Sequence, residues 1–213
     1  MPFFDAPRRL RQPDVTRGKV LQAASLDAIL AGAGVTKGAL YHHFPSKAVL
    51  GHAVVSEVIT GFLVERWSGT LPERPADPLS ALADVFRHRA AEANPSEAEL
   101  GCPLNNIAQK MAPLDAEFRR LIDAAYERWI ELFAGALEVG RQAGTVRPDV
   151  DPRRVATFLV SAIEGSYSLA KGQRDLTVLQ SNLGMMVEYL EGLRGDAKTE
   201  RRDDGKTGRQ MDG

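Results

Sequence analysis

The chain has 213 residues, of which 44% are hydrophobic and 26% charged, and its formal net charge is −1. This composition is ordinary for a globular protein, and the length suits one medium domain or a small domain joined to a larger one. No apolar run approaches the roughly 20 residues that cross a bilayer, and the N-terminus has no apolar signal segment. The single cysteine, Cys102, excludes an internal disulfide framework and suits a reducing cytoplasm, which is the location we expect.

Charge is unevenly distributed along the chain. Residues 1–53 contain seven Lys and Arg residues against three Asp residues, a net +4, and the remaining residues therefore carry −5. A basic first segment on an acidic body fits a nucleic-acid contact confined to one end of the molecule.

The apolar residues recur at helical spacing throughout and no strand-like alternation is sustained, so we predict an all-α protein. Ser46 is a candidate N-cap, and Asp77-Pro78 and Asp151-Pro152 each combine an N-cap with proline at the first helical position. Loops are expected at the Pro- and Gly-rich stretches 69–78, 94–103 and 144–152. Helices are expected, in chain order, over residues 16–24, 26–32, 37–43, 46–67, 78–93, 103–111, 114–144, 152–171 and 176–193.

Residues 26–43 have the spacing of a helix-turn-helix, whose second helix enters the DNA major groove. Gly34 supplies the turn, and Thr36 is expected to cap the second helix, whose first residues would reach base edges or phosphates. Lys47 follows the cap at Ser46, where the N–H groups of a helix N-terminus suit a phosphate. The candidate DNA-binding residues are Arg17, Ser25, Thr36, Lys37, Gly38, Tyr41, His42 and Lys47.

Several segments resemble a known family. GVTKGALYHHFPSK (34–47) closely resembles a signature of the TetR/AcrR family of bacterial transcriptional regulators, and SLDAILAGAG before it aligns in register. The body is similar to the ligand-binding domain of the LmrA/YxaF-like subgroup. Together the resemblances cover roughly residues 14–194, and the segments similar to the subgroup are 101–111, 114–137 and 151–175.

The resemblance implies a small helix-turn-helix domain followed by a larger helical bundle. It also implies a homodimer, usually a repressor, that leaves a palindromic operator when a small molecule enters the bundle. The expected partners are therefore double-stranded DNA, a small-molecule effector and a second copy of the chain, with no membrane and no cofactor. The expected segments are a flexible basic arm (1–13), the DNA-binding domain (14–53), the effector-binding and dimerisation domain (54–194) and a disordered tail (195–213).

The first helix of the DNA-binding domain is short by comparison with the family. The family's first helix runs about four turns, whereas here TRGKVLQAA (16–24) meets SLDAI directly, so roughly a dozen residues are absent. Nine residues make on the order of 13 Å of helix, which is marginal without tertiary packing. The alternative function is therefore a dimeric ligand-binding module whose DNA binding is impaired or lost.

An apolar pocket with a few convergent polar groups is expected in the helical bundle. Asn105 and Glu164 are the more telling candidates, because a buried amide or carboxylate needs a partner that a ligand can supply. Core packing is the alternative interpretation of each candidate. The candidate effector-binding residues are Cys102, Asn105, Asn106, Tyr126, Trp129, Phe133, Glu164 and Tyr167.

Cys102 precedes Pro103 at an expected helix start, where the helix dipole lowers the pKa of a thiol and favours a reactive thiolate. A sensor of oxidants or electrophiles is one hypothesis for this residue, and a small packing residue is the other.

The last two expected helices carry an apolar stripe suited to a four-helix dimer interface. The candidate interface residues are Val155, Phe158, Leu159, Ala162, Leu179, Leu183, Met186 and Leu190.

Catalysis is not expected. The sequence contains no paired cysteines, no G-x-S-x-G and no H-E-x-x-H, and the GKT at 205–207 lacks the upstream glycine of a phosphate-binding loop because residue 200 is Glu. His42 and His43 are adjacent on a helix and do not share a face, so no metal site is expected.

Overall fold

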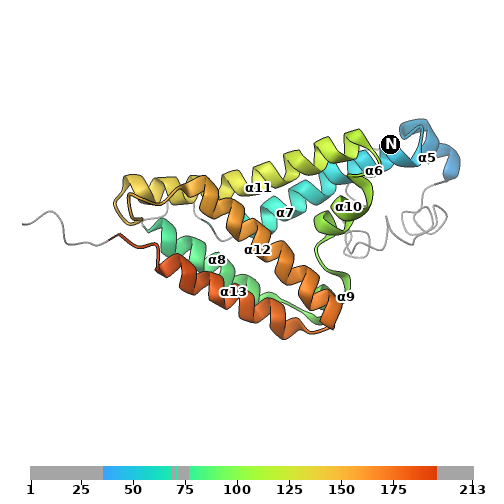
Figure 1. Cartoon of the computed structure of the whole chain (residues 1–213). Coiled ribbons are helices and arrows are strands. Elements are labelled where there is room, and N and C mark those ends of the chain that lie inside the picture. Colours follow the sequence, from blue (N-terminus) through green and yellow to red (C-terminus); the bar gives the residue numbers. More distant parts are fainter. Residues whose placement is uncertain (1–35, 69–70, 72–76, 196–213) are drawn as a thin grey trace, which may run out of the picture.

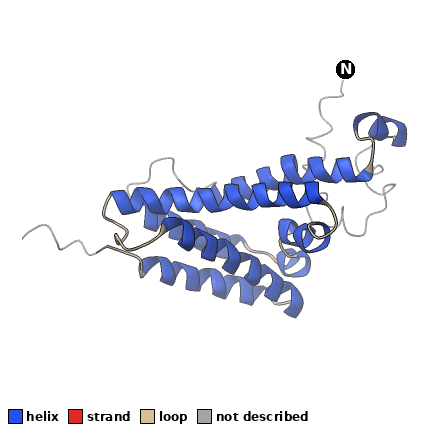
Figure 2. Cartoon of the chain, turned by 45° about the horizontal axis from the view of Figure 1, so that its top comes forward, coloured by secondary structure: helices blue, strands red, loops and turns tan. Residues whose placement is uncertain are grey.

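A computed structural model describes residues 36–68, 71 and 77–195 of the chain (Figure 1). Every element in this part of the chain is a helix, and its only β-type pairing is an isolated bridge between Val146 and Arg194 (Figure 2). The predicted all-α class is therefore confirmed. The helices predicted over 16–24 and 26–32, the basic arm and nearly all of the tail lie outside the described residues.

The described chain begins with a short helix followed by a long one. We call residues 36–53 the reading end and its first helix the reading helix, after the DNA contact that the sequence predicts there. Helix α5 (Lys37–His43) begins at Thr36, whose hydroxyl accepts a hydrogen bond from Ala39 N at 3.3 Å. The predicted cap at Ser46 is confirmed, because its hydroxyl accepts from Val49 N at 3.2 Å. From there a continuous helix runs from Lys47 to Ser68 as α6 (Lys47–Ala53), a π-helical segment η2 (Val54–Ile59) and α7 (Thr60–Ser68).

The Lys47–Ser68 helix is the one helix of the described chain that is long and apolar enough to cross a membrane. Its apolar side chains Val55, Leu63 and Trp67 are buried in the protein core. Packing inside the protein therefore accounts for these apolar side chains.

Six further helices form the body, and most begin at an aspartate or asparagine. Asp77, Asp115 and Asp151 each accept two backbone N–H bonds at the start of a helix, as the sequence predicts for the first and third of them. The helices are α8 (Pro78–Glu92), α9 (Pro95–Leu100), α10 (Pro103–Met111), α11 (Ala116–Gln142), α12 (Pro152–Gln173) and α13 (Leu176–Glu191).

The predicted loop at 94–103 is wrong, because residues 95–100 form α9. Asn94 caps this helix through Ser96 N, and Pro95 stands at its first position, so Asn94-Pro95 is the same signature as Asp77-Pro78. The helix is only six residues long, too short for apolar periodicity to indicate it.

The body helices pack as neighbours around one core. Helix α8 lies beside α13, α12 lies between α11 and α13, and the Lys47–Ser68 helix runs along α11 (Figure 1). Trp67, Phe86, Trp129 and Phe133 are fully buried at the centre, and the ring centroids of Trp67 and Trp129 are 5.1 Å apart. Offset and edge-to-face aromatic pairs contribute roughly 0.5–1.5 kcal/mol each beyond their buried area. This cluster joins the long helix to α8 and α11.

Candidate functional site

The reading helix α5 presents its polar residues to solvent at one end of the molecule (Figure 1). Lys37 and Tyr41 are one helical turn apart on the same face, and both are exposed. Among the residues that the structure describes, a side chain at Gly38 would meet nothing within 4 Å. His42 is exposed beside His43, with ring centroids 5.2 Å apart.

The start of α6 continues this exposed surface. Lys47 is exposed immediately after the Ser46 cap. The inner side of α6 contacts α11 closely, because Gly51 faces the ring of Phe118 and His52 Nε2 lies 3.3 Å from Asp115 Oδ1. The reading end is therefore packed against the body through α6. The candidates Arg17 and Ser25 lie outside the described residues.

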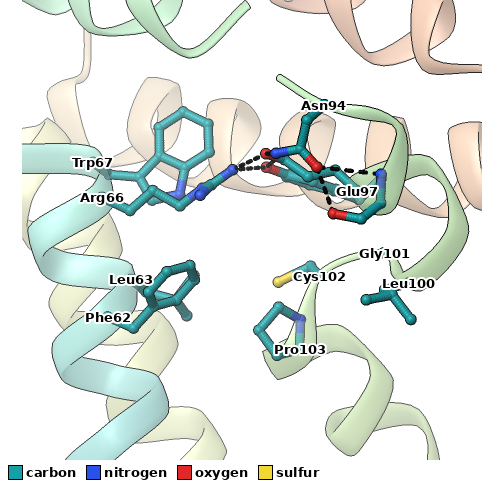
Figure 3. Close-up of a pocket in the computed structure, with 12 residues that line it drawn as sticks. Phe62, Leu63, Arg66, Trp67, Asn94, Glu97, Leu100, Gly101, Cys102 and Pro103 are labelled. Atoms are coloured by element: carbon teal, nitrogen blue, oxygen red, sulfur yellow. Dashed lines mark hydrogen bonds and ion pairs between the residues drawn. The ribbon is translucent and has the colours of Figure 1, made fainter. Parts of the chain in front are cut away.

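A cavity of about 220 Å³ opens between the end of α7 and the α8–α10 connection (Figure 3). One wall is the C-terminal part of α7, with Phe62, Leu63, Arg66 and Trp67, and the opposite wall carries Cys102 and Pro103. The remaining lining residues are Asn94, Ser96, Glu97, Leu100, Gly101 and Tyr167. The cavity is mostly apolar, with a cluster of charged and polar groups at one side.

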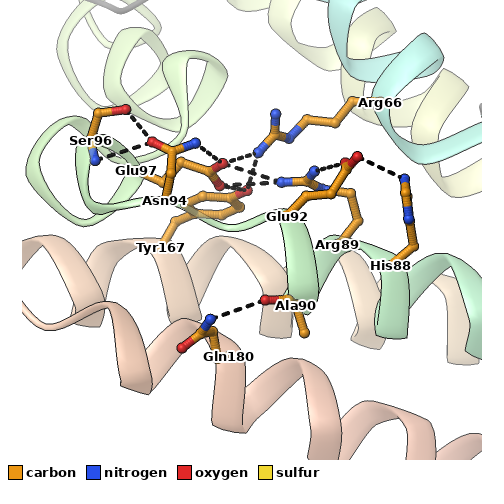
Figure 4. Close-up of polar contacts among 10 residues, drawn as sticks. All are labelled: Arg66, His88, Arg89, Ala90, Glu92, Asn94, Ser96, Glu97, Tyr167 and Gln180. Atoms are coloured by element: carbon orange, nitrogen blue, oxygen red, sulfur yellow. Dashed lines mark hydrogen bonds and ion pairs between the residues drawn. The ribbon is translucent and has the colours of Figure 1, made fainter.

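Glu97 is the centre of that polar cluster (Figure 4). Its carboxylate lies 2.5 Å from Arg66 Nη2, and both of its oxygens accept from Arg89 Nη2 at 3.3 Å. The Tyr167 hydroxyl donates to it at 2.9 Å and Asn94 Nδ2 at 3.1 Å. This one carboxylate, whose side chain is 12% exposed, thus connects α7, α8, α9 and α12.

The surroundings of the cluster keep Arg66 charged and the Tyr167 hydroxyl protonated. Burial alone would lower the pKa of Arg66, but the Tyr167 hydroxyl and the Glu97 carboxylate outweigh burial and raise it, so Arg66 stays charged. Burial raises the pKa of Tyr167 to about 12, against the opposing effect of Arg66, so its hydroxyl keeps the proton that it donates.

A second buried acid lies next to the cavity. Glu164 on α12 accepts a hydrogen bond from the Cys102 thiol at 3.2 Å through Oε1, and its Oε2 has no hydrogen-bond partner in the described structure. Burial raises the pKa of Glu164 to about 7, although the Cys102 bond acts in the opposite direction. Glu164 is therefore protonated in a large fraction of molecules near neutral pH.

For Cys102 the alternative of a small packing residue describes the structure. Burial and the neighbouring Glu164 carboxyl raise the pKa of the thiol well above its ordinary value, although backbone N–H groups at the start of α10 act in the opposite direction. The thiol is 3% exposed. The desolvation of a buried thiolate outweighs the helix-start effect on which the prediction rested.

The structure places the other predicted effector residues in different environments. Tyr167 lines the cavity with Cys102, whereas Trp129 and Phe133 lie in the aromatic core against Trp67 and do not line it. Tyr126 is half-buried, and burial raises the pKa of its hydroxyl, with Glu164 adding to the effect. For Trp129 and Phe133 the alternative of core packing describes the structure.

Asn105 and Asn106 are bonded within the fold and are not cavity residues. Asn105 Nδ2 donates to Ser168 Oγ at 2.9 Å, and Asn106 Nδ2 donates to the Leu100 carbonyl at 2.7 Å. Lys171 Nζ donates to Asn106 Oδ1 at 2.7 Å. These amides fasten α10 to α12, so their hydrogen-bonding needs are met without a ligand.

Most of the cavity's polar lining was not predicted from the sequence. Arg66 and Glu97 are 101 and 70 residues from Tyr167 along the chain, and each alone resembles an ordinary surface charge. Arg66 directly follows Glu65 near the end of the long helix, so the pair resembles ordinary solvent-facing charges. No local signal distinguishes Arg66 or Glu97.

The predicted dimer stripe is wrong for most of its members. Six of the eight residues are buried in the chain's own core, and Ala162 is half-buried. Phe158 is exposed and stacks against exposed Tyr189, with ring centroids 5.1 Å apart. Helices α12 and α13 carry two apolar faces, and the prediction selected the inner one. The buried six are Val155, Leu159, Leu179, Leu183, Met186 and Leu190.

An all-helical body with a cavity, joined by one helix to the exposed helix α5, is the architecture that the resemblance to DNA-binding regulators predicted. Residues 21–54 match the family described as bacterial regulatory proteins, tetR family, and residues 78–182 match the LmrA/YxaF-like C-terminal domain. The chain belongs to the TetR family of bacterial transcriptional regulators, with a body of the LmrA/YxaF-like type, as the sequence resemblance predicted. It is a regulator and not an enzyme.

Individual relatives agree with this assignment. The chain is 28% identical over 167 residues to the HTH-type transcriptional repressor DhaR of Mycobacterium sp. (strain GP1), covering 78% of this chain and 82% of that protein. It is 27% identical to the uncharacterized HTH-type transcriptional regulator YxaF of Bacillus subtilis, covering 74% and 79%. A regulatory protein TetR from Rhodobacter sphaeroides has the same fold, with a TM-score of 0.73 and 24% identity over 87% of this chain and 98% of that one.

Proposed function

We propose that this protein is a ligand-responsive repressor in the cytoplasm that binds a palindromic operator as a homodimer and is released by a small molecule. One observation carries the proposal. The Lys47–Ser68 helix begins directly beyond the reading helix α5 and ends with Arg66 and Trp67 in the cavity wall. A ligand that moves the last turn of this helix therefore acts on the element that holds the reading end.

The DNA contact is assigned to the exposed residues of α5 and the start of α6. Lys37, Tyr41 and His42 would reach base edges or phosphates, and Gly38 permits close approach. Thr36 and Lys47 stand at the starts of two helices, where the N–H groups favour phosphate oxygens. Arg17 and Ser25 remain predictions of the sequence. The domain boundary at 53/54 remains a proposal, and it falls inside the continuous helix.

The dimer contact is assigned to the outer face of α12 and α13. Phe158, Leu169, Met185 and Tyr189 are exposed there, and large apolar side chains exposed together on neighbouring helices mark an interaction surface. A second copy packed on this face would form a four-helix interface. The two reading helices of such a dimer would lie about 34–36 Å, or a multiple of that, apart on DNA.

Titration against palindromic duplexes selected from random DNA, at two salt concentrations, tests the DNA-binding part. Lys47→Ala is expected to weaken binding and lower the salt slope by about 1, whereas Lys110→Ala, an exposed lysine of α10, leaves both unchanged. Binding without salt dependence, or equal effects of the two variants, would contradict the assignment.

A version with a family-like first helix restored distinguishes this function from the alternative. If both versions select the same palindrome with similar affinity, the short first helix is tolerated and the protein is a working repressor. If only the restored version binds, the protein is a dimeric ligand-binding module whose grip on DNA is impaired. Binding by neither version would contradict both.

A further inference from the structure

In the polar cluster of the cavity, as the described part of the chain forms it, the hydrogen-bond acceptors are occupied but some of the donors are free. A carboxylate offers about four lone-pair sites, and Glu97 fills them with donors from Arg66, Arg89, Tyr167 and Asn94. Glu97 therefore has no acceptor capacity left for a ligand. A ligand in this part of the cavity would therefore bind to hydrogen-bond donors of the cluster and not to the Glu97 carboxylate.

Arg66 holds that unused donor capacity. Its side chain is 19% exposed, and only its Nη2 group is engaged, by Glu97 and Tyr167. Among the described residues its Nε and Nη1 groups have no hydrogen-bond partner, and Arg66 lines the cavity. A guanidinium binds a carboxylate through two parallel bonds from Nη2 together with either Nε or Nη1, so an acid paired with Arg66 in this way uses one free group and competes with Glu97 for Nη2.

Arg66 can change partner without leaving Glu97 exposed as a lone charge. Arg89 is 4% exposed and contacts both Glu97 oxygens, while Tyr167 and Asn94 continue to donate to the same carboxylate. Arg66 is thus the exchangeable cation of the cluster, because it lines the cavity and Arg89 does not (Figure 4).

The rest of the cavity sets the shape of the occupant. Phe62, Leu63 and Trp67 form one apolar wall and Pro103 stands in the opposite wall, so a flat or branched apolar body fits between them (Figure 3). The volume of about 220 Å³ is below the roughly 300–1,000 Å³ typical of ligand sites, which indicates a small molecule.

We propose that the cavity binds a small organic acid whose carboxylate pairs with Arg66 and whose aromatic or branched aliphatic body lies between Phe62 and Pro103. The acid competes with Glu97 for Arg66 and so loosens α7 from α9. This inference rests on the proposed function, because the acid would be the effector that the repressor requires. The proposal therefore predicts that the cavity prefers an anion over a neutral or cationic molecule of the same shape.

The test is calorimetric titration of the full chain, without DNA, with three acids and their shape-matched neutral and cationic counterparts. The acids are benzoate, phenylacetate and isovalerate, each compared with its primary amide and the corresponding amine. At least one acid is expected to bind roughly tenfold or more tightly than its amide and its amine. An amide or amine that binds as tightly as the acid overturns the proposal, and so does the failure of all three acids to bind in the millimolar range.

Variants assign the preference to Arg66. Arg66→Gln is expected to abolish the preference for acid over amide, whereas Arg87→Gln, an exposed arginine of α8, preserves it. Should Arg66→Gln not fold, Arg66→Lys keeps the charge but loses the fork, and roughly a tenfold loss of acid affinity is expected. Glu97→Gln removes the competing carboxylate, and acid binding is expected to tighten several-fold. An acid preference that survives in Arg66→Gln, or an acid affinity that is unchanged in both Arg66→Lys and Glu97→Gln, overturns the proposal.

Release from DNA is measured separately with the same acids. An acid that binds through Arg66 but leaves the operator complex intact supports this inference and contradicts the ligand-controlled part of the proposed function. Release by an amide or amine with no acid binding supports the proposed function and overturns this inference.

Discussion

At the scale of single residues, Glu164 couples stability to pH. The carboxyl ordinarily titrates at 4.5, and burial raises its pKa in the folded protein to about 7. Between these pH values the folded state holds a proton that the unfolded state has lost. The stability that this proton contributes is fully present below pH 4.5 and is lost as the pH rises to about 7.

Replacing Glu164 with Gln is therefore expected to stabilise the protein at pH 8 and to change little at pH 4. The gain at pH 8 is on the order of 2–3 kcal/mol, because the amide carries no charge that must be desolvated. Urea unfolding at both pH values measures it. Glu131→Gln, at an exposed position of α11, is the control and should show no pH-dependent gain. Equal effects of the Glu164 change at pH 4 and pH 8 would refute this coupling.

The thiol of Cys102 is expected to be unreactive in the folded protein. It is buried, and its pKa is well above the ordinary value because of burial and the nearby Glu164. Since this is the only cysteine, the rate of thiol modification by Ellman's reagent reports on it alone. The rate in buffer should be at least roughly tenfold lower than in urea. Similar rates would restore the hypothesis of a reactive sensor thiol.

At the scale of helices, the contact between α6 and α11 depends on a glycine. A Cβ added at Gly51 would lie 2.6 Å from Phe118 Cζ, and that ring is buried against His52. Gly51→Ala is therefore expected to destabilise the protein by about 1–3 kcal/mol, despite the better helix propensity of alanine.

Gly61, ten residues further along the same long helix, is the matched control, because a Cβ there would meet nothing within 4 Å. Gly61→Ala should stabilise the protein by about 0.5–1 kcal/mol. Thermal unfolding of both variants shows whether each substitution lowers or raises the stability of the protein. A stabilised Gly51→Ala variant would show that Phe118 moves aside at little cost.

Helix boundaries were largely predictable because their signals are local. A capping side chain and a proline at the first position act within four residues, so Ser46, Asp77-Pro78 and Asp151-Pro152 marked their helices correctly. Helix α9 was missed although Asn94-Pro95 gives the same signal. Its six residues provide no second apolar turn by which the sequence could confirm it.

At the scale of the whole molecule, the outer face of α12 and α13 decides the oligomeric state. Phe158→Glu is expected to convert the proposed dimer to a folded monomer, because a charge would be buried in the interface without a partner. Light scattering and circular dichroism measure mass and helicity. Leu114→Glu, at another exposed apolar position, should remain dimeric. A Phe158→Glu protein with the mass of the unsubstituted one would place the interface elsewhere.

The site itself was less predictable than the fold. Periodicity identifies that a helix such as α12 is apolar on two sides, but it does not tell which side faces the chain's own core, so Leu159 was assigned outward. The cavity joins residues from α7, the α8–α10 connection and α12, which no local pattern relates. Helix α5 and the start of α6 were predicted well because the signals that set them, the caps Thr36 and Ser46, lie within one short segment.

The π-helical segment Val54–Ile59 sets the angle, about the axis of the long helix, between the direction of α5 and the direction of Arg66. The Val55 carbonyl accepts from Thr60 N, five residues on, and also from the Thr60 hydroxyl at 2.8 Å. Such a turn holds about one residue more than an α-helical turn, and one residue of α-helix rotates the chain by roughly 100°. Deleting one residue within this segment would therefore leave α5 and Arg66 facing as they do now. Deleting one residue of α7 before Arg66 would instead rotate the reading helix by roughly 100° about the axis of the Lys47–Ser68 helix. In the proposed dimer the two reading helices could then no longer face the same side of the DNA.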